Sequence, residues 1–197
     1  MLYSPDMKQN KKITPIQTHF IGVLPPDEIA ATLEDRRRYM REKYGCYSGQ
    51  QTPLHITLVP PFHLPEEFSL RDLAESIISE IQPYSDELRF SAVIENFDAF
   101  GDRTIFAKII QDERWTKLRN KVLESVLNFI PNCTKKDRRP FLPHITIANR
   151  DIPSGVSKDV LEVFNESDFT ESFEVDNVTI FERKNYRWEI AGRIEIN

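Results

Sequence analysis

Two short stretches, PLHITL at residues 53–58 and LPHITI at residues 142–147, are nearly identical and lie in different halves of the 197-residue chain. Each places a histidine two residues before a threonine, with apolar residues between and after them. Successive side chains of a strand point to opposite faces, so each stretch predicts a strand with one apolar face and one His–Thr face. An internal pseudo-twofold axis would bring the two polar faces to one cleft.

The rest of the chain mixes helical and strand-like patterns. Apolar spacing with capping and breaking residues predicts helices over Asp27–Tyr44, Ser69–Tyr84, Asp112–Ile130 and Ser157–Phe164. Alternation predicts strands over Gln17–Leu24, Pro53–Pro60, Leu88–Phe100, Thr104–Ile110, His144–Ala148, Phe173–Arg183 and Tyr186–Ile196. Because strands and helices do not alternate regularly, the pattern favours an α+β fold. We expect a flexible N-terminal arm at residues 1–15 and a single domain at residues 16–197.

Charge and cysteine content limit the class of protein. A net charge of −5 argues against holding long duplex DNA, so a nucleic-acid ligand would be a short end or a nucleotide. Cys46 and Cys133 lack the spacing of a metal site or redox pair and are expected as free thiols. Residues 1–12 are polar, unlike a signal peptide, and no apolar run approaches the ~20 residues of a membrane span. We therefore expect a cytoplasmic protein with no membrane partner.

The paired motifs suit phosphoryl chemistry. Histidine titrates near neutral pH, so one of His55 and His144 can accept a proton while the other donates one. Thr57 and Thr146 can hold the non-bridging phosphate oxygens, where charge develops in the transition state. Zinc sites typically show closely spaced histidine pairs, which neither motif has. We expect acid–base catalysis without metal or cofactor, and the sequence does not assign which histidine is the base.

Paired H-x-T-x motifs in the two halves of an α+β chain of this length resemble the two-histidine (2H) phosphoesterases. That family includes the RNA 2′,3′-cyclic phosphodiesterases, also called 2′–5′ RNA ligases. The resemblance implies two pseudo-symmetric lobes around a central cleft, each a small, mostly antiparallel sheet with helices outside. It also implies metal-free opening of a 2′,3′-cyclic phosphate or related phosphodiester, with His55, Thr57, His144 and Thr146 in the site by position. After the first motif the chain departs from many members, which leaves the substrate open.

Several residues near the motifs are candidates for contacts with substrate. They are Phe62 and Phe141, which could stack a base, and His63, Arg138, Arg139 and Arg150. Core burial is an equal alternative for either phenylalanine, and so is a solvated loop for the basic stretch at residues 135–139. For His63 a surface or loop position is favoured over a role in the site. The arginines at residues 36–38 spread around a predicted helix, and we interpret them as a solvated face.

The sequence therefore predicts a phosphodiesterase acting on a nucleotide or short RNA end. Two alternatives use the same residues. One is a binding module that holds a phosphate-bearing ligand without turnover, and the other is ligation in the reverse direction. Oligomeric state is not predicted.

Overall fold

The computed structural model describes residues 16–134 and 140–197. The predicted N-terminal arm (residues 1–15) and Arg138 and Arg139 of the basic loop lie outside the described residues. The elements in chain order are β1 (His19–Val23), α1 (Asp27–Tyr44), β2 (Ile56–Phe62), α2 (Leu70–Ile81), the 3₁₀ turn η1 (Gln82–Tyr84), α3 (Ser85–Leu88), β3 (Phe90–Ala99), β4 (Thr104–Ile109), α4 (Glu113–Phe129), β5 (His144–Asn149), α5 (Val156–Phe164), β6 (Thr170–Val175), β7 (Asn177–Lys184) and β8 (Arg187–Glu195).

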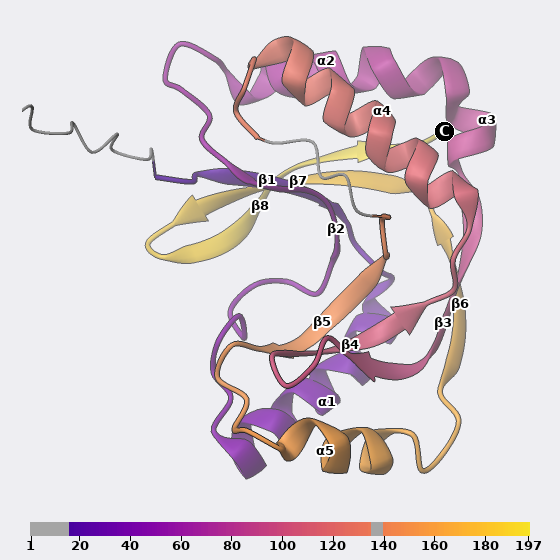
Figure 1. The fold of residues 1–197 in the computed structure, drawn as a ribbon. Coiled ribbons are helices and arrows are strands. Elements are labelled where there is room, and N and C mark those ends of the chain that lie inside the picture. Colours follow the sequence, from indigo (N-terminus) through magenta and orange to yellow (C-terminus); the bar gives the residue numbers. More distant parts are fainter. Residues whose placement is uncertain (1–15, 135–139) are drawn as a thin grey trace, which may run out of the picture.

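The eight strands form one curled antiparallel sheet in the order β6-β3-β4-β5-β2-β1-β7-β8 (Figure 1). The predicted α+β class is confirmed. A strand–helix–strand unit, β1-α1-β2, occupies one half of the sheet with β7 and β8, and a second unit, β4-α4-β5, occupies the other with β3 and β6. The two halves meet where Ile56 of β2 pairs with Ile145 of β5, so the two predicted lobes share one continuous sheet.

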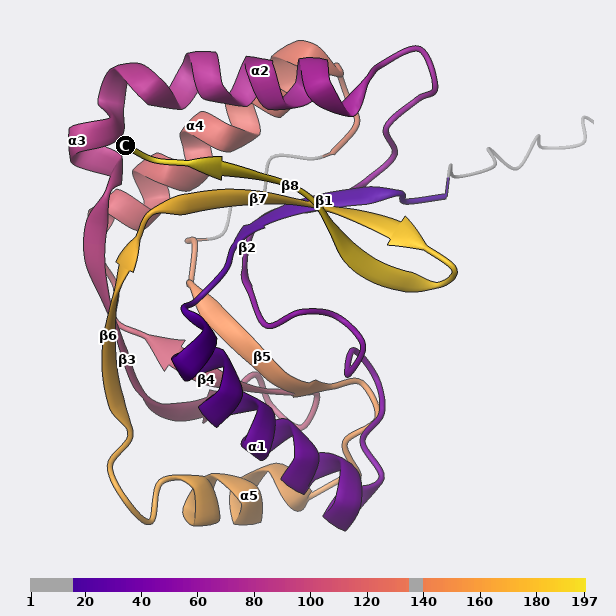
Figure 2. The same cartoon turned by 180° about the vertical axis from the view of Figure 1, so that it is seen from behind.

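The helices are exchanged between the two halves. α1 follows β1 along the chain but packs against β5, and α4 follows β4 but packs against β2. The two opposite views agree that α2 and α4 lie together at one end of the molecule and α1 and α5 at the other (Figures 1 and 2). Each motif strand is therefore held in place by a helix that belongs to the other half.

Local sequence signals explain where the helices begin and end. α1 carries Asp27 and Glu28 in its first turn and ends at Gly45, whose φ of 69° is the left-handed conformation that glycine adopts readily. The hydroxyl of Ser69 accepts the amide hydrogen of Asp72 at 3.1 Å and caps α2. The predicted bounds of α1 match the observed ones.

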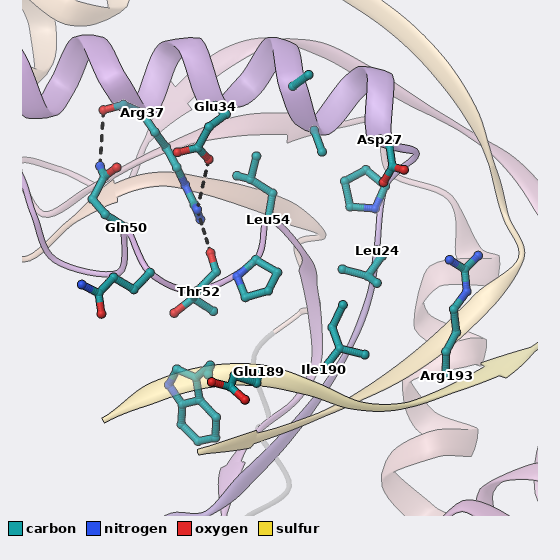
Figure 3. Close-up of a pocket in the computed structure, with 16 residues that line it drawn as sticks. Leu24, Asp27, Glu34, Arg37, Gln50, Thr52, Leu54, Glu189, Ile190 and Arg193 are labelled. Atoms are coloured by element: carbon teal, nitrogen blue, oxygen red, sulfur yellow. Dashed lines mark hydrogen bonds and ion pairs between the residues drawn. The ribbon is translucent and has the colours of Figure 1, made fainter. Parts of the chain in front are cut away.

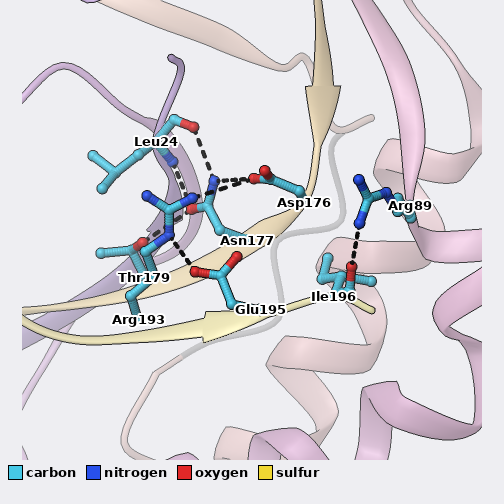
Figure 4. A network of polar contacts seen from close by, with 8 residues as sticks. All are labelled: Leu24, Arg89, Asp176, Asn177, Thr179, Arg193, Glu195 and Ile196. Atoms are coloured by element: carbon cyan, nitrogen blue, oxygen red, sulfur yellow. Dashed lines mark hydrogen bonds and ion pairs between the residues drawn. The ribbon is translucent and has the colours of Figure 1, made fainter. Parts of the chain in front are cut away.

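The predicted strand Phe173–Arg183 is wrong as one element. The chain divides it into β6, which pairs with β3 at one edge of the sheet, and β7, which pairs with β1. The cause is the buried side chain of Asn177. Its Nδ2 donates to the carbonyl of Leu24 at 3.0 Å, and its Oδ1 accepts the backbone N–H of Leu24 at 3.0 Å (Figure 4). This contact starts β7 beside the end of β1.

The apolar faces of the sheet and helices enclose a continuous core. Its largest wholly buried side chains include Trp115 of α4, Phe62 of β2 and Phe164 of α5. Within the described part of the chain, no helix combines the length and the apolar character needed to cross a membrane.

Candidate active site

The pairing of β2 with β5 brings the two motifs face to face. Ile56 lies opposite Ile145, and both are wholly buried. Continuing this antiparallel register by one residue in each direction places His55 opposite Thr146 and Thr57 opposite His144. Opposed side chains on one face of an antiparallel pair have Cβ atoms about 4.5–5.5 Å apart. We infer from this register that the two motif histidines and their threonines share one face of the paired strands.

The two histidines are oriented in the same way. Nδ1 of His55 lies 2.7 Å from the carbonyl oxygen of Pro53, and Nδ1 of His144 lies 2.8 Å from that of Leu142. A carbonyl oxygen only accepts, so each Nδ1 carries a proton, and Nε2 is the ring atom of each histidine that can gain or lose one. In the first motif the hydroxyl of Thr57 donates to Nε2 of His55 at 3.1 Å.

Each imidazole also packs against two phenylalanine rings that contact each other. The ring of His55 is 4.6 Å from Phe20 and 5.2 Å from Phe181, and the ring of His144 is 5.1 Å from both Phe100 and Phe106. These apolar surroundings make charging the rings costly, and burial lowers the pKa of both histidines. For His55 the pKa falls to about 4, because burial is joined by the positive charges of Arg37 and His144, while the bond to Pro53 opposes the shift.

A cavity of about 450 Å³ opens beside the motifs. His55, Thr57 and Thr146 line it. His144 is not among the lining residues, but it lies two residues before Thr146 on β5 and so on the same face of that strand. Of the described residues that line this cavity, three are arginines (Arg37, Arg150 and Arg187) and none is Asp or Glu. An acidic protein thus presents locally positive charge to the cavity, as an anion site requires.

The walls of the cavity come from segments that lie far apart in the sequence. Trp188 lies at the start of β8 and packs edge-on against Phe20 at 4.8 Å. Tyr47 and Ser48 belong to the loop after α1, and both donate their amide hydrogens to the carboxylate of Asp151 at 2.7 Å. Asp151 follows the second motif, so this contact fixes the loop after α1 beside the end of β5.

Arg37 is the residue that the sequence interpretation placed wrongly. The prediction of a solvated face is wrong at this position, because Arg37 is only 5% exposed. The reason is periodicity: with Ile29, Leu33 and Met40, Arg37 completes the buried stripe of α1. That spacing is present in the sequence and would have separated Arg37 from its two neighbours.

Of the other candidate residues that the structure describes, Arg150 lines the cavity, whereas Phe62, Phe141 and His63 do not. Arg150 lines the cavity, with a left-handed φ of 73° and its amide donating to the carbonyl of Arg103 at 2.9 Å. Phe62 is 1% exposed in the core, so the prediction that it could stack a base is wrong. Phe141 packs against the core, and the guanidinium of Arg119 lies 5.3 Å from its ring. His63 donates from Nδ1 to the carbonyl of Ile16 at 3.0 Å. Neither residue lines the cavity.

Comparisons with known proteins assign the family. Residues 25–187 match the 2′-5′ RNA ligase superfamily, and the chain belongs to this family of two-histidine phosphoesterases. A search of curated proteins gives no match. The fold is similar to that of TT0787 of Thermus thermophilus, with a TM-score of 0.63 and 20% sequence identity over 91% of this chain and 97% of that one. It is also similar to E. coli LigT in crystals with 3′-AMP (TM-score 0.59) and with NADP+ (TM-score 0.57), each 18% identical over 91% of this chain and 97% of LigT.

Proposed function

We propose that the protein is a metal-independent phosphodiesterase that opens 2′,3′-cyclic phosphates, or cleaves 2′–5′ phosphodiesters, on nucleotides or RNA ends. The observation that carries the proposal is the pairing of Ile56 of β2 with Ile145 of β5, which brings the two motifs together beside a cavity lined by His55, Thr57, Thr146 and three arginines. Among the described residues no three His, Cys, Asp or Glu side chains gather as a metal site would require.

The two histidines divide the proton transfers in the proposed reaction. His55, with a pKa near 4, is unprotonated at neutral pH and takes a proton from water at Nε2 as the P–O bond to water forms. His144 donates a proton to the ribose oxygen as the P–O bond to that oxygen breaks. One proton is taken and one is given, and the product is a phosphate monoester. Thr57, Thr146 and Arg150 hold the non-bridging oxygens.

The relatives support a nucleotide as the ligand. LigT is described in crystals with 3′-AMP and with NADP+. A phosphate of such a ligand would lie among the three arginines, and the bound dianion or monoanion would favour the protonated form of His144 that the reaction needs. The ligase direction uses the same groups in reverse, and a binding module would use the cavity without turnover.

The proposal is tested by chromatography of products from 2′,3′-cyclic AMP. We expect turnover by the natural chain that EDTA does not reduce, a loss of about 10²–10⁴-fold in His55→Ala and in His144→Ala, and no loss in His63→Ala, whose ring lies outside the cavity. Tight binding of the cyclic nucleotide without product would favour the binding module. Loss of turnover in EDTA, or full turnover in either motif variant, would contradict the mechanism.

A further inference from the structure

Arg37 is a charged side chain in an otherwise apolar stripe. Its guanidinium donates from Nη1 to the carbonyl of Thr52 at 2.7 Å (Figure 3). It also donates from Nη2 to the carbonyl of Thr146 at 3.4 Å. Its nearest carboxylate is Glu34 at 3.5 Å, and that side chain is 46% exposed. Nε has no partner among the described residues. A buried charge is costly unless it is well paired, so stability alone is a weak reason for an arginine here.

Of the two carbonyl groups that Arg37 contacts, one directly precedes the first motif and the other lies in the second motif. Thr52 lies three residues before His55, and Thr146 is the threonine of the second motif. Arg37 reaches both because α1 packs against β5 while the chain after it leads into β2. One side chain therefore joins the segment that carries His55 to the strand that carries His144.

We propose that Arg37 is a positioning residue of the active site, which fixes the two motifs relative to each other and keeps a permanent positive charge behind the bound phosphate. The inference rests on the proposed function. A planar guanidinium suits this role because it donates from separate nitrogens in fixed directions, whereas a lysine ammonium donates from a single point. The same charge is one cause of the low pKa of His55, after burial, and so favours the unprotonated ring that a base requires.

Three variants of the full chain separate the two roles of Arg37, which are fixing the motifs in place and supplying a positive charge. Arg37→Met removes both, Arg37→Lys keeps the charge, and Arg38→Met is the control, since Arg38 is the next residue but 52% exposed and paired to Asp35 at 2.7 Å. The measurements are kcat and KM for 2′,3′-cyclic AMP and the pH profile of kcat/KM, with thermal unfolding to establish folding.

For Arg37→Met we expect kcat to fall about 10²-fold, as small displacements of reacting groups produce, and the acidic limb of the profile to move to higher pH. In Arg37→Lys, kcat should fall about 10-fold, because the fixed geometry is lost. The acidic limb of the pH profile should stay at the pH of the natural chain, because the positive charge remains. Arg38→Met should match the natural chain. A folded Arg37→Met with the kcat and the profile of Arg38→Met would overturn the inference.

Two further measurements cover the remaining cases. If Arg37→Met does not fold, Arg37→Gln replaces it, because glutamine removes the charge and keeps a donor. If the natural chain does not turn over 2′,3′-cyclic AMP, the proposed function fails, and NMR titration of His55 with binding of inorganic phosphate then tests Arg37 directly. Weaker phosphate binding and a higher His55 titration in Arg37→Gln would sustain the role of Arg37, and unchanged values would end it.

Discussion

The two halves of the molecule repeat one geometry but differ in their charges. Both motif histidines donate Nδ1–H to a carbonyl two residues earlier, and both pack against a pair of phenylalanine rings. The helices behind them differ. α1 places Arg37 in its buried stripe against β5, whereas the buried residues of α4 against β2 are apolar except for Ser125, which bonds Ser76 at 2.9 Å.

This difference teaches how a repeated motif can yield two distinct catalytic groups. Titratable groups whose environments push their pKa values apart are the usual acid and base of an active site. Burial lowers the pKa of both histidines, but only for His55 does Arg37 contribute to the shift, which reaches about 4. We therefore expect symmetric positions and asymmetric roles.

The largest effect should come from separating those roles by leaving group. His55→Ala and His144→Ala should each lose about 10²–10⁴-fold on a cyclic nucleotide. On a 2′-deoxynucleoside 4-nitrophenyl phosphodiester, where the leaving phenolate needs no proton, His144→Ala should recover most of its rate and His55→Ala should not. If the rate recovered in His55→Ala instead, His55 would be the acid and His144 the base. If both variants responded equally to the leaving group, the two histidines would not have distinct roles.

The threonines test the symmetry itself. Thr57→Val and Thr146→Val should each lower kcat by about 10²-fold, because each removes a hydroxyl expected to bind developing negative charge. The loss should be larger for Thr57→Val, whose hydroxyl also bonds Nε2 of His55. The matched variants Thr57→Ser and Thr146→Ser keep the hydroxyl and should stay near the natural rate in the same assay.

Gly22 tests a requirement that only the first half has. A Cβ at this position of β1 would lie 2.6 Å from the carbonyl oxygen of Ile56 and 3.4 Å from Cδ2 of His55, whereas β4 contains no glycine. Gly22→Ala should lower the free energy of unfolding by about 1–3 kcal/mol through overpacking. Gly192→Ala is the control, since its Cβ would meet nothing within 4 Å. Urea denaturation of both variants measures the difference, and equal stabilities would show that β1 can shift enough against β2 to accept a Cβ at this position.

The smallest effect concerns stability and pH. The pKa of His55 falls from 6.5 in the unfolded chain to about 4 in the folded one, so between these values the unfolded state binds more protons. The contribution of His55 to stability is fully present above pH 6.5 and declines as the pH falls toward 4. Between pH 7 and pH 5 we expect the natural chain to lose roughly 1–2 kcal/mol more than His55→Gln. Parallel denaturation curves of both chains at the two pH values measure this difference.

Much of the fold was predictable because its signals are local. The H-x-T alternation fixes which face of β2 and β5 is apolar. Gly45 marks the end of α1 and Ser69 the start of α2. Pairing partners follow from contacts between distant residues and are not local. The division between β6 and β7 depends on Asn177 meeting the backbone of Leu24, and no proline or glycine marks it.

The site was predictable in its motifs and not in its walls. The family and the presence of His55, Thr57 and Thr146 around one cavity agree with the repeat. Trp188 and Tyr47 reach that cavity through the β7–β8 hairpin and the Asp151 contact, which exist only in the folded chain. The roles of all these residues remain predictions.

The exchange of helices between the halves has a consequence for how such a chain could have arisen. A half-length ancestor of this build would leave its own motif strand uncovered, and it would be stable only as a homodimer in which each copy lent its helix to the other. In that dimer the two histidines would have had identical surroundings. An arginine behind only one of them requires the two halves to differ in sequence, which identical copies in a homodimer cannot do.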